Sequence, residues 1–198
     1  SEDSLEMKVK VGSVIDLKVT ASVEGENKSL DWEIKQLEFT ATETSTKIEF
    51  KSLEEGEYAV LLDTVMVAEV EPANLYATFS ELENLARDPM KFNYAPYATK
   101  EEQVLFSGFE DAPVGYAKLD DEIDGWTVTN EQVRVSQSAK AHSGGYYATL
   151  SRNKTGEGDE TGGAITRDLP TAVGQDYRLS FVTHAGGDDA EYVLGGVI

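Results

Sequence analysis

Acidic side chains dominate the residues that could do chemistry. The chain of 198 residues has 37 Asp and Glu, two histidines and no cysteine. His142 and His184 stand in Gly- and Ser-rich turns far apart in the sequence, and no serine lies in a GxSxG elbow. With so many acidic residues, some pair will by chance lie at the separation that glycosidases use. The number of acidic residues is therefore no evidence for acid and base catalysis. We therefore expect that the protein is not an enzyme.

Composition narrows the classes of partner. The net charge of −20 argues against a basic face for nucleic acid or anionic lipid, because attraction to phosphate supplies much of that affinity. No stretch approaches the roughly 20 apolar residues of a membrane span, so membrane insertion is not expected. Without cysteine there is no disulfide framework and no thiolate site for zinc. Cations and neutral ligands are the compatible partners.

Tyrosines are the side chains best suited to contact a neutral ligand, since aromatic rings pack on the apolar faces of sugars. In GGYYATLSR, alternation along a strand would turn Tyr146 and its alternate neighbours inward and the residues between them outward. The candidate ligand-binding residues are Tyr147, Thr149, Arg152 and, in a loop closer to the N-terminus, Tyr116. For Trp32 and Trp126 we expect core packing in preference to sugar stacking.

Strands are the elements that must position these side chains. Apolar and polar residues alternate in DLKVTASV, QLEFTA and TKIEF, and turns such as EGEN and EEGE separate them. This spacing of short strands predicts an all-β sandwich or jelly roll and no alternation of strands and helices. Leu17, Val19, Ala21, Val23, Leu37, Phe39, Ala41, Ile48 and Phe50 are the predicted inward positions.

One segment departs from the strand pattern. In NLYATFSELENLARDP the apolar residues recur at helical spacing, Asn74 can cap the start, and Pro89 limits continuation. Residues 71–104 are therefore predicted to form a connector with one short helix between two all-β blocks. These blocks are residues 1–70 and residues 105–198.

The motifs of the two blocks occur in an unusual order. The second block contains LFSGFEDAP, DGWTVT, AKAHSGGYYATLS and VGQDYRLSF, whereas the first contains LEFTATETSTKIEF and YAVLLDTVMV. This set resembles the CBM4/9/22-like group of carbohydrate-binding jelly rolls and the related DUF642 and choice-of-anchor bacterial surface domains. In those families the motifs of the second block come first. The resemblance implies a galactose-binding-domain-like jelly-roll β-sandwich, with 105–198 as its N-terminal half and 1–70 as its C-terminal half.

Three arrangements explain this order. In the first, the chain is a circularly permuted module, which is tolerable because domain termini often lie close together. Alternatively, it is a slice of a tandem array, or a half-module completed by the next molecule through strand complementation. Closure within one chain is the preferred prediction, because separate halves would expose unpaired strand edges.

The resemblance also implies a structural calcium ion. In the sugar-binding jelly rolls such an ion lies where the opening strand meets the closing Asp strand. The matching residues are Glu110 and Asp63, with Ser143 and Gly145 in the HSGG turn as sources of further oxygen ligands. The remaining acidic clusters, residues 119–124, 156–163 and 186–191, lack EF-hand spacing and are predicted to be solvated loops.

These expectations combine into one predicted function. The protein would be a non-catalytic, extracellular or cell-surface module that binds polysaccharide or cell-wall glycan and is stabilised by Ca²⁺. The alternative is a structural or adhesive surface subunit that associates with itself head to tail into a filament. A third prediction is an accessory domain of a larger glycoside hydrolase.

Overall fold

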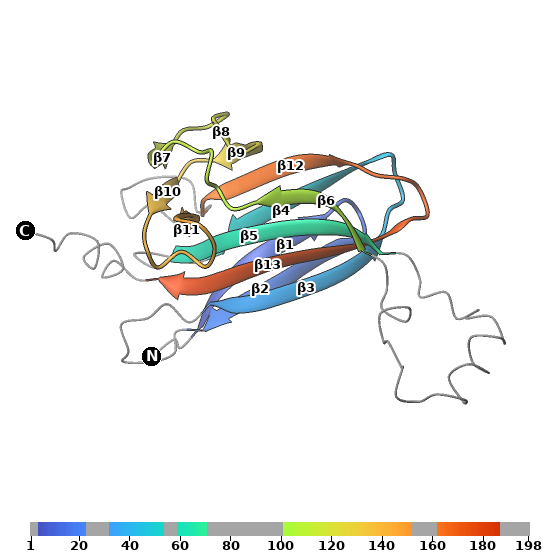
Figure 1. The fold of residues 1–198 in the computed structure, drawn as a ribbon, viewed down its shortest axis with the longest axis horizontal. Helices are drawn as coiled ribbons and strands as arrows, with labels where there is room; N and C mark the ends of the chain where they lie inside the picture. Colours follow the sequence, from blue (N-terminus) through green and yellow to red (C-terminus); the bar gives the residue numbers. More distant parts are fainter. Residues whose placement is uncertain (1–3, 23–31, 54–58, 71–100, 152–161, 187–198) are drawn as a thin grey trace, which may run out of the picture.

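Two antiparallel sheets packed face to face make up the fold. The structure is a computed structural model and describes residues 4–22, 32–53, 59–70, 101–151 and 162–186. In Figure 1, β3, β13, β5 and β6 run side by side across one layer, with β1 and β4 behind them. The all-β sandwich predicted from the sequence is thus confirmed.

Sheet A has six strands in the order β2, β1, β4, β12, β9, β8. Their bounds are Ile15–Ser22 for β2, Ser4–Val11 for β1, Ser45–Ser52 for β4, Ala164–Pro170 for β12, Trp126–Asn130 for β9 and Glu122–Ile123 for β8.

Sheet B has seven strands. Six follow the order β3, β13, β5, β11, β10, β7, and β6 pairs with β5. Their bounds are Glu33–Thr40 for β3, Asp176–Gly186 for β13, Ala59–Val70 for β5, Tyr146–Ser151 for β11, Val133–Gln137 for β10, Gly115–Ala117 for β7 and Glu101–Ser107 for β6.

Alternation of side chains builds the core between the sheets. The predicted inward residues are buried or packed against the core cluster, except Val23, which lies outside the described residues. Leu5, Met7, Val9 and Val11 of β1 form a further buried row. The two-residue period read from the sequence is therefore the period of burial.

Strands from both ends of the chain interleave in each sheet. In sheet A, β4 pairs with β12, and in sheet B, β5 lies between β13 on one side and β11 and β6 on the other. The Phe50 ring lies 5.5 Å from Trp126 of the same sheet and 5.0 Å from Phe181 of the facing sheet, centroid to centroid. The described strands before and after residues 71–100 thus share one apolar interior.

The connector lies mostly outside the described residues, and its predicted helix with it. β6 already begins at Glu101, so residues 101–104 of the predicted connector belong to a strand. In the described part of the chain, no helix has the length and hydropathy that crossing a membrane requires.

Candidate functional site

A row of polar and aromatic side chains crosses one end of sheet B on its outer face. Arg134 of β10 is opposite Tyr116 of β7 on one side and Thr149 of β11 on the other. Val133 and Val135, the neighbours of Arg134, are buried in the core. Because strand side chains alternate between faces, the row points away from the core. The structure thus brings together two of the predicted ligand-binding residues, Tyr116 and Thr149.

Tyr116 lies at the mouth of a hollow between the edges of the two sheets. Its side chain is 69% exposed, and the guanidinium carbon of Arg134 is 5.3 Å from its ring centroid. We call the hollow, of about 260 Å³, the edge hollow; Pro113, Val114, Tyr116, Ala117, Asp121, Glu122 and Ile123 line it. Strands β7 and β8, which supply part of this lining, lie at the upper left of Figure 1.

Arg134, Asp121 and Glu122 were not predicted as site residues. Asp121 and Glu122 belong to the cluster predicted to be a solvated loop, and both are exposed. The signal for Arg134 was its position between two valines in VRVSQ, which places a long cationic side chain on the outer face of a strand.

Tyr147 points to the same outer face but is buried. Its side chain is only 4% exposed, because the Trp32 ring lies 5.9 Å from it, centroid to centroid. A sugar cannot stack on a covered ring, so Tyr147 is not an open platform. Burial raises the pKa of the Tyr147 phenol above 10.0, against the opposing effects of a hydrogen bond with Ser136 and the charge of Arg134.

This raised pKa predicts a loss of stability at alkaline pH. Since the folded state disfavours the tyrosinate, the contribution of Tyr147 is complete below its unfolded pKa of 10.0 and is lost as pH rises through the higher folded pKa. From pH 8 to about pH 11, wild type is expected to lose more unfolding free energy than Tyr147→Phe, as measured by urea denaturation. Equal losses would contradict the burial of the phenol.

The two tryptophans occupy different environments. Trp126 is 0% exposed and belongs to the core, which confirms its predicted role. Core packing is wrong for Trp32, which is half-buried on the outer face of sheet B with His142, Tyr147 and His184 around it, at centroid distances of 5.9 to 6.2 Å. Its Nε1 donates a hydrogen bond of 3.0 Å to the Lys140 carbonyl. Trp32 therefore joins the start of β3 to the loop between β10 and β11.

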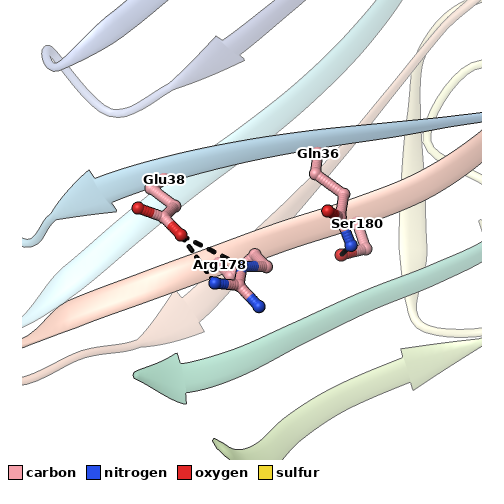
Figure 2. A network of polar contacts seen from close by, with 4 residues as sticks. All are labelled: Gln36, Glu38, Arg178 and Ser180. Carbon is pink, nitrogen blue, oxygen red and sulfur yellow. Dashed lines mark hydrogen bonds and ion pairs between the residues drawn. The ribbon is translucent and has the colours of Figure 1, made fainter. Parts of the chain in front are cut away.

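A second polar group lies further along the outer face of sheet B (Figure 2). Arg178 donates from Nε and Nη2 to the Glu38 carboxylate, at 3.1 and 2.7 Å, and Gln36 donates to Ser180 at 3.4 Å. Phe106 of β6 is 49% exposed in the same sheet. These residues were not among the predicted site residues, although their alternation along β3 and β13 places them on the outer face.

The four predicted calcium residues do come together. Asp63, which is 0% exposed, accepts hydrogen bonds at its two carboxylate oxygens from the backbone N–H groups of Thr64, at 2.5 Å, and Ser143, at 3.0 Å. Glu110 accepts at Oε1 from the backbone N–H groups of Gly145, at 2.8 Å, and Tyr146, at 3.0 Å. Both carboxylates therefore contact the same turn, residues 142–145.

The donor set of this turn does not fit a calcium ion. Calcium requires six to eight oxygen ligands, whereas the turn presents N–H groups to both carboxylates. The Gly145 carbonyl accepts a hydrogen bond from the Ser138 N–H at 2.8 Å. Among the described residues, no three His, Asp or Glu side chains gather closely enough to bind a metal. Burial also raises the pKa of Asp63, although its backbone hydrogen bonds act in the opposite direction.

The same turn brings a histidine next to hydroxyl groups. The Thr64 hydroxyl lies 3.0 Å from His142 Nδ1 and 2.9 Å from the Ser143 hydroxyl. In a catalytic triad a carboxylate orients the imidazole. Here the Asp63 oxygens accept from Thr64 and Ser143. The arrangement ties the turn to β5 and does not supply the geometry of a nucleophile with an oriented base.

Arg152, the remaining predicted ligand-binding residue, lies outside the described residues.

Comparison with protein-family models, with curated proteins and with solved structures gives no match for this chain. The class that fold and site define is therefore an antiparallel β-sandwich with an aromatic-rimmed hollow at its edge.

Proposed function

We propose that the protein is a non-catalytic carbohydrate-binding module that holds its ligand at the edge hollow. The observation that supports this most directly is Tyr116, a 69% exposed ring beside a hollow of about 260 Å³. Aromatic residues with one accessible face bind the apolar face of a sugar ring. Arg134 lies against the Tyr116 ring and limits its movement, so the platform needs little ordering when a ligand binds.

The lining of the hollow suits a neutral glycan. Carboxylates of Asp121 and Glu122 can accept hydrogen bonds from sugar hydroxyl groups, while the exposed side chain of Val114 supplies apolar contact. The same carboxylates, in a chain of net charge −20, repel anionic polysaccharides. The proposed partner is therefore a neutral polysaccharide or cell-wall glycan, met outside the cell or at its surface.

The absence of catalysis is part of the proposal and is supported by the position of the histidines. His142 and His184 both lie beside Trp32, with ring centroids 6.2 and 6.1 Å away. The His142 ring is hydrogen-bonded to the Thr64 hydroxyl, and Asp63 accepts a hydrogen bond from the neighbouring Ser143 N–H. Both contacts hold the turn against β5. Neither histidine is among the residues that line the edge hollow.

Affinity electrophoresis in gels containing neutral plant, algal or bacterial polysaccharides tests the proposal. Wild type is expected to be retarded by at least one of them, and Tyr116→Ala to bind it about tenfold more weakly, because truncated aromatic anchors commonly cost more than 1 kcal/mol. Phe106→Ala is the matched control, since it removes another exposed ring of sheet B that is not among the residues lining the hollow. No retardation by any polysaccharide would refute the proposal, and equal losses in both variants would refute the site.

Assembly into a filament remains the alternative proposal. Because the described strands close one core within a single chain, exchange between molecules would have to replace pairs such as β4 with β12. Size-exclusion chromatography with light scattering separates the two. A monomer at high concentration would exclude the filament and leave the carbohydrate proposal standing.

A further inference from the structure

We infer that backbone amides of residues 143–146 hold Asp63 and Glu110 in place of a calcium ion, so that the junction between β5 and the turn at 142–145 needs no metal. This inference concerns the junction alone and is independent of sugar binding. It rests on the hydrogen-bond donors that surround the two carboxylates and on the irregular backbone that they support.

The junction lies where β5 changes its partner. Residues 59–62 of β5 pair with β11, and residues 65–70 pair with β6. Between them, Thr64 has φ of 49°, a left-handed conformation that is rare for a β-branched residue and costs of order 1 kcal/mol or more. Opposite this point, the register with β13 shifts between Ser180 and Val182. Such a kink persists only when surrounding contacts hold it.

Asp63 supplies the first of these contacts. Its carboxylate accepts from the Thr64 N–H, which fixes the kinked residue, and from the Ser143 N–H, which fixes the turn. The Ser143 hydroxyl adds a longer contact of 3.5 Å. Since Asp63 is 0% exposed, these donors also compensate for the loss of water around the carboxylate.

Glu110 supplies the second contact with a single oxygen. Oε1 accepts both the Gly145 and the Tyr146 N–H, a pair of adjacent donors of the kind that forms anion-binding nests. The turn can approach so closely because Gly144 has φ of 59° and no side chain; a Cβ there would lie 2.2 Å from Oε1.

These donors oppose a cation at the same place. Each N–H directs the positive end of its dipole at a carboxylate oxygen, which occupies a lone pair of that oxygen and would repel a cation placed there. A calcium site would instead need carbonyl oxygens turned inward, yet the Gly145 carbonyl is directed to Ser138. The amides therefore stabilise the two carboxylates without a metal ion.

Thermal unfolding of wild type, Glu110→Gln and Glu110→Ala in EDTA and in millimolar CaCl₂ tests the inference. The glutamine keeps a carbonyl oxygen that accepts both N–H groups, so it is expected to retain most of the stability. The alanine removes the acceptor and is expected to lower Tm by about 4–8 °C, with or without calcium. Wild-type Tm is expected to be the same in both solutions, and calorimetric titration of wild type with CaCl₂ is expected to show no binding heat from the junction.

A calcium ion bound at the junction would give a different pattern of melting temperatures. A bound calcium ion at a hundred times its dissociation constant would raise wild-type Tm by about 5–10 °C, and Glu110→Gln would lose that rise along with the charged ligand. This outcome overturns the inference. An equal rise in wild type and both variants would place the ion elsewhere and support a junction without metal. If Glu110→Ala does not fold, wild type and Glu110→Gln alone still decide between these outcomes.

Discussion

Replacing Trp126 with alanine is expected to lower the free energy of unfolding by about 4 kcal/mol. The side chain is 0% exposed and packs against Phe50 with centroids 5.5 Å apart. Its Nε1 donates to the Ser107 hydroxyl at 3.1 Å, and that hydroxyl donates to Asp124 at 2.6 Å. Truncation therefore leaves a large cavity and removes the donor to a buried hydroxyl.

Trp32→Ala is the matched control for this prediction. It deletes the same side chain from the half-buried outer face, where the expected loss is about 1–2 kcal/mol because less area is buried and less cavity remains. Each variant keeps one of the chain's two tryptophans, so both can be followed by fluorescence during urea denaturation. If Trp32→Ala were the more destabilising, the placement of the two rings in the sandwich would be wrong.

Gly144→Ala is expected to destabilise the protein by about 2–3 kcal/mol. A residue with φ of 59° is strained once it carries a Cβ, and this Cβ would meet Glu110 Oε1 at 2.2 Å. The Glu110 side chain can swing away, but it then gives up the N–H groups of Gly145 and Tyr146. The cost thus combines backbone strain with the loss of two hydrogen bonds to a charged group.

Gly145→Ala separates this effect from a general intolerance of the turn. Its added Cβ meets nothing within 4 Å, so the expected change is below about 1 kcal/mol. Urea denaturation of both variants gives the comparison. Adding Glu110→Ala to Gly144→Ala should cost much less than Glu110→Ala alone, because both changes remove the same hydrogen bonds. Full additivity would show that Glu110 does not hold the turn.

The strands and much of the core could be predicted from the sequence, because alternation depends only on neighbouring residues. Val19, Phe39, Ile48 and Phe50 are buried as their positions in alternating segments indicate. The interior position of Trp126 was implied by the family resemblance and not by alternation, and the structure confirms it. Alternation also predicted which way Tyr147 points, since a strand sends successive side chains to opposite faces.

Exposure on the outer face could not be predicted in this way. Tyr147 faces outward yet is buried, because Trp32, 115 positions earlier in the chain, lies across it with centroids 5.9 Å apart. Tyr116, on the edge strand β7, remains 69% exposed. Alternation tells which face a side chain takes, but only the packing of distant segments tells whether that face is covered.

The junction of Asp63 and Glu110 with the turn at 142–145 likewise divides into a part that the sequence indicates and a part that it does not. The family resemblance implied that Asp63, Glu110 and the turn at 142–145 would meet, and the structure brings them within hydrogen-bond distance. Which atoms of the turn face the carboxylates depends on the backbone angles of Thr64, where β5 changes its strand partner, and of Gly144 within the turn.

The amino-acid sequence by itself determined that this chain forms strands, that they have one apolar face each, and that its surface is strongly acidic, because these properties follow from residue type and spacing along the backbone. Tertiary structure decided that strands from both ends of the chain interleave, that Tyr116 borders a hollow while Tyr147 is covered, and that N–H groups surround Asp63 and Glu110. Those features arise from contacts between residues far apart in the chain, which local spacing does not encode.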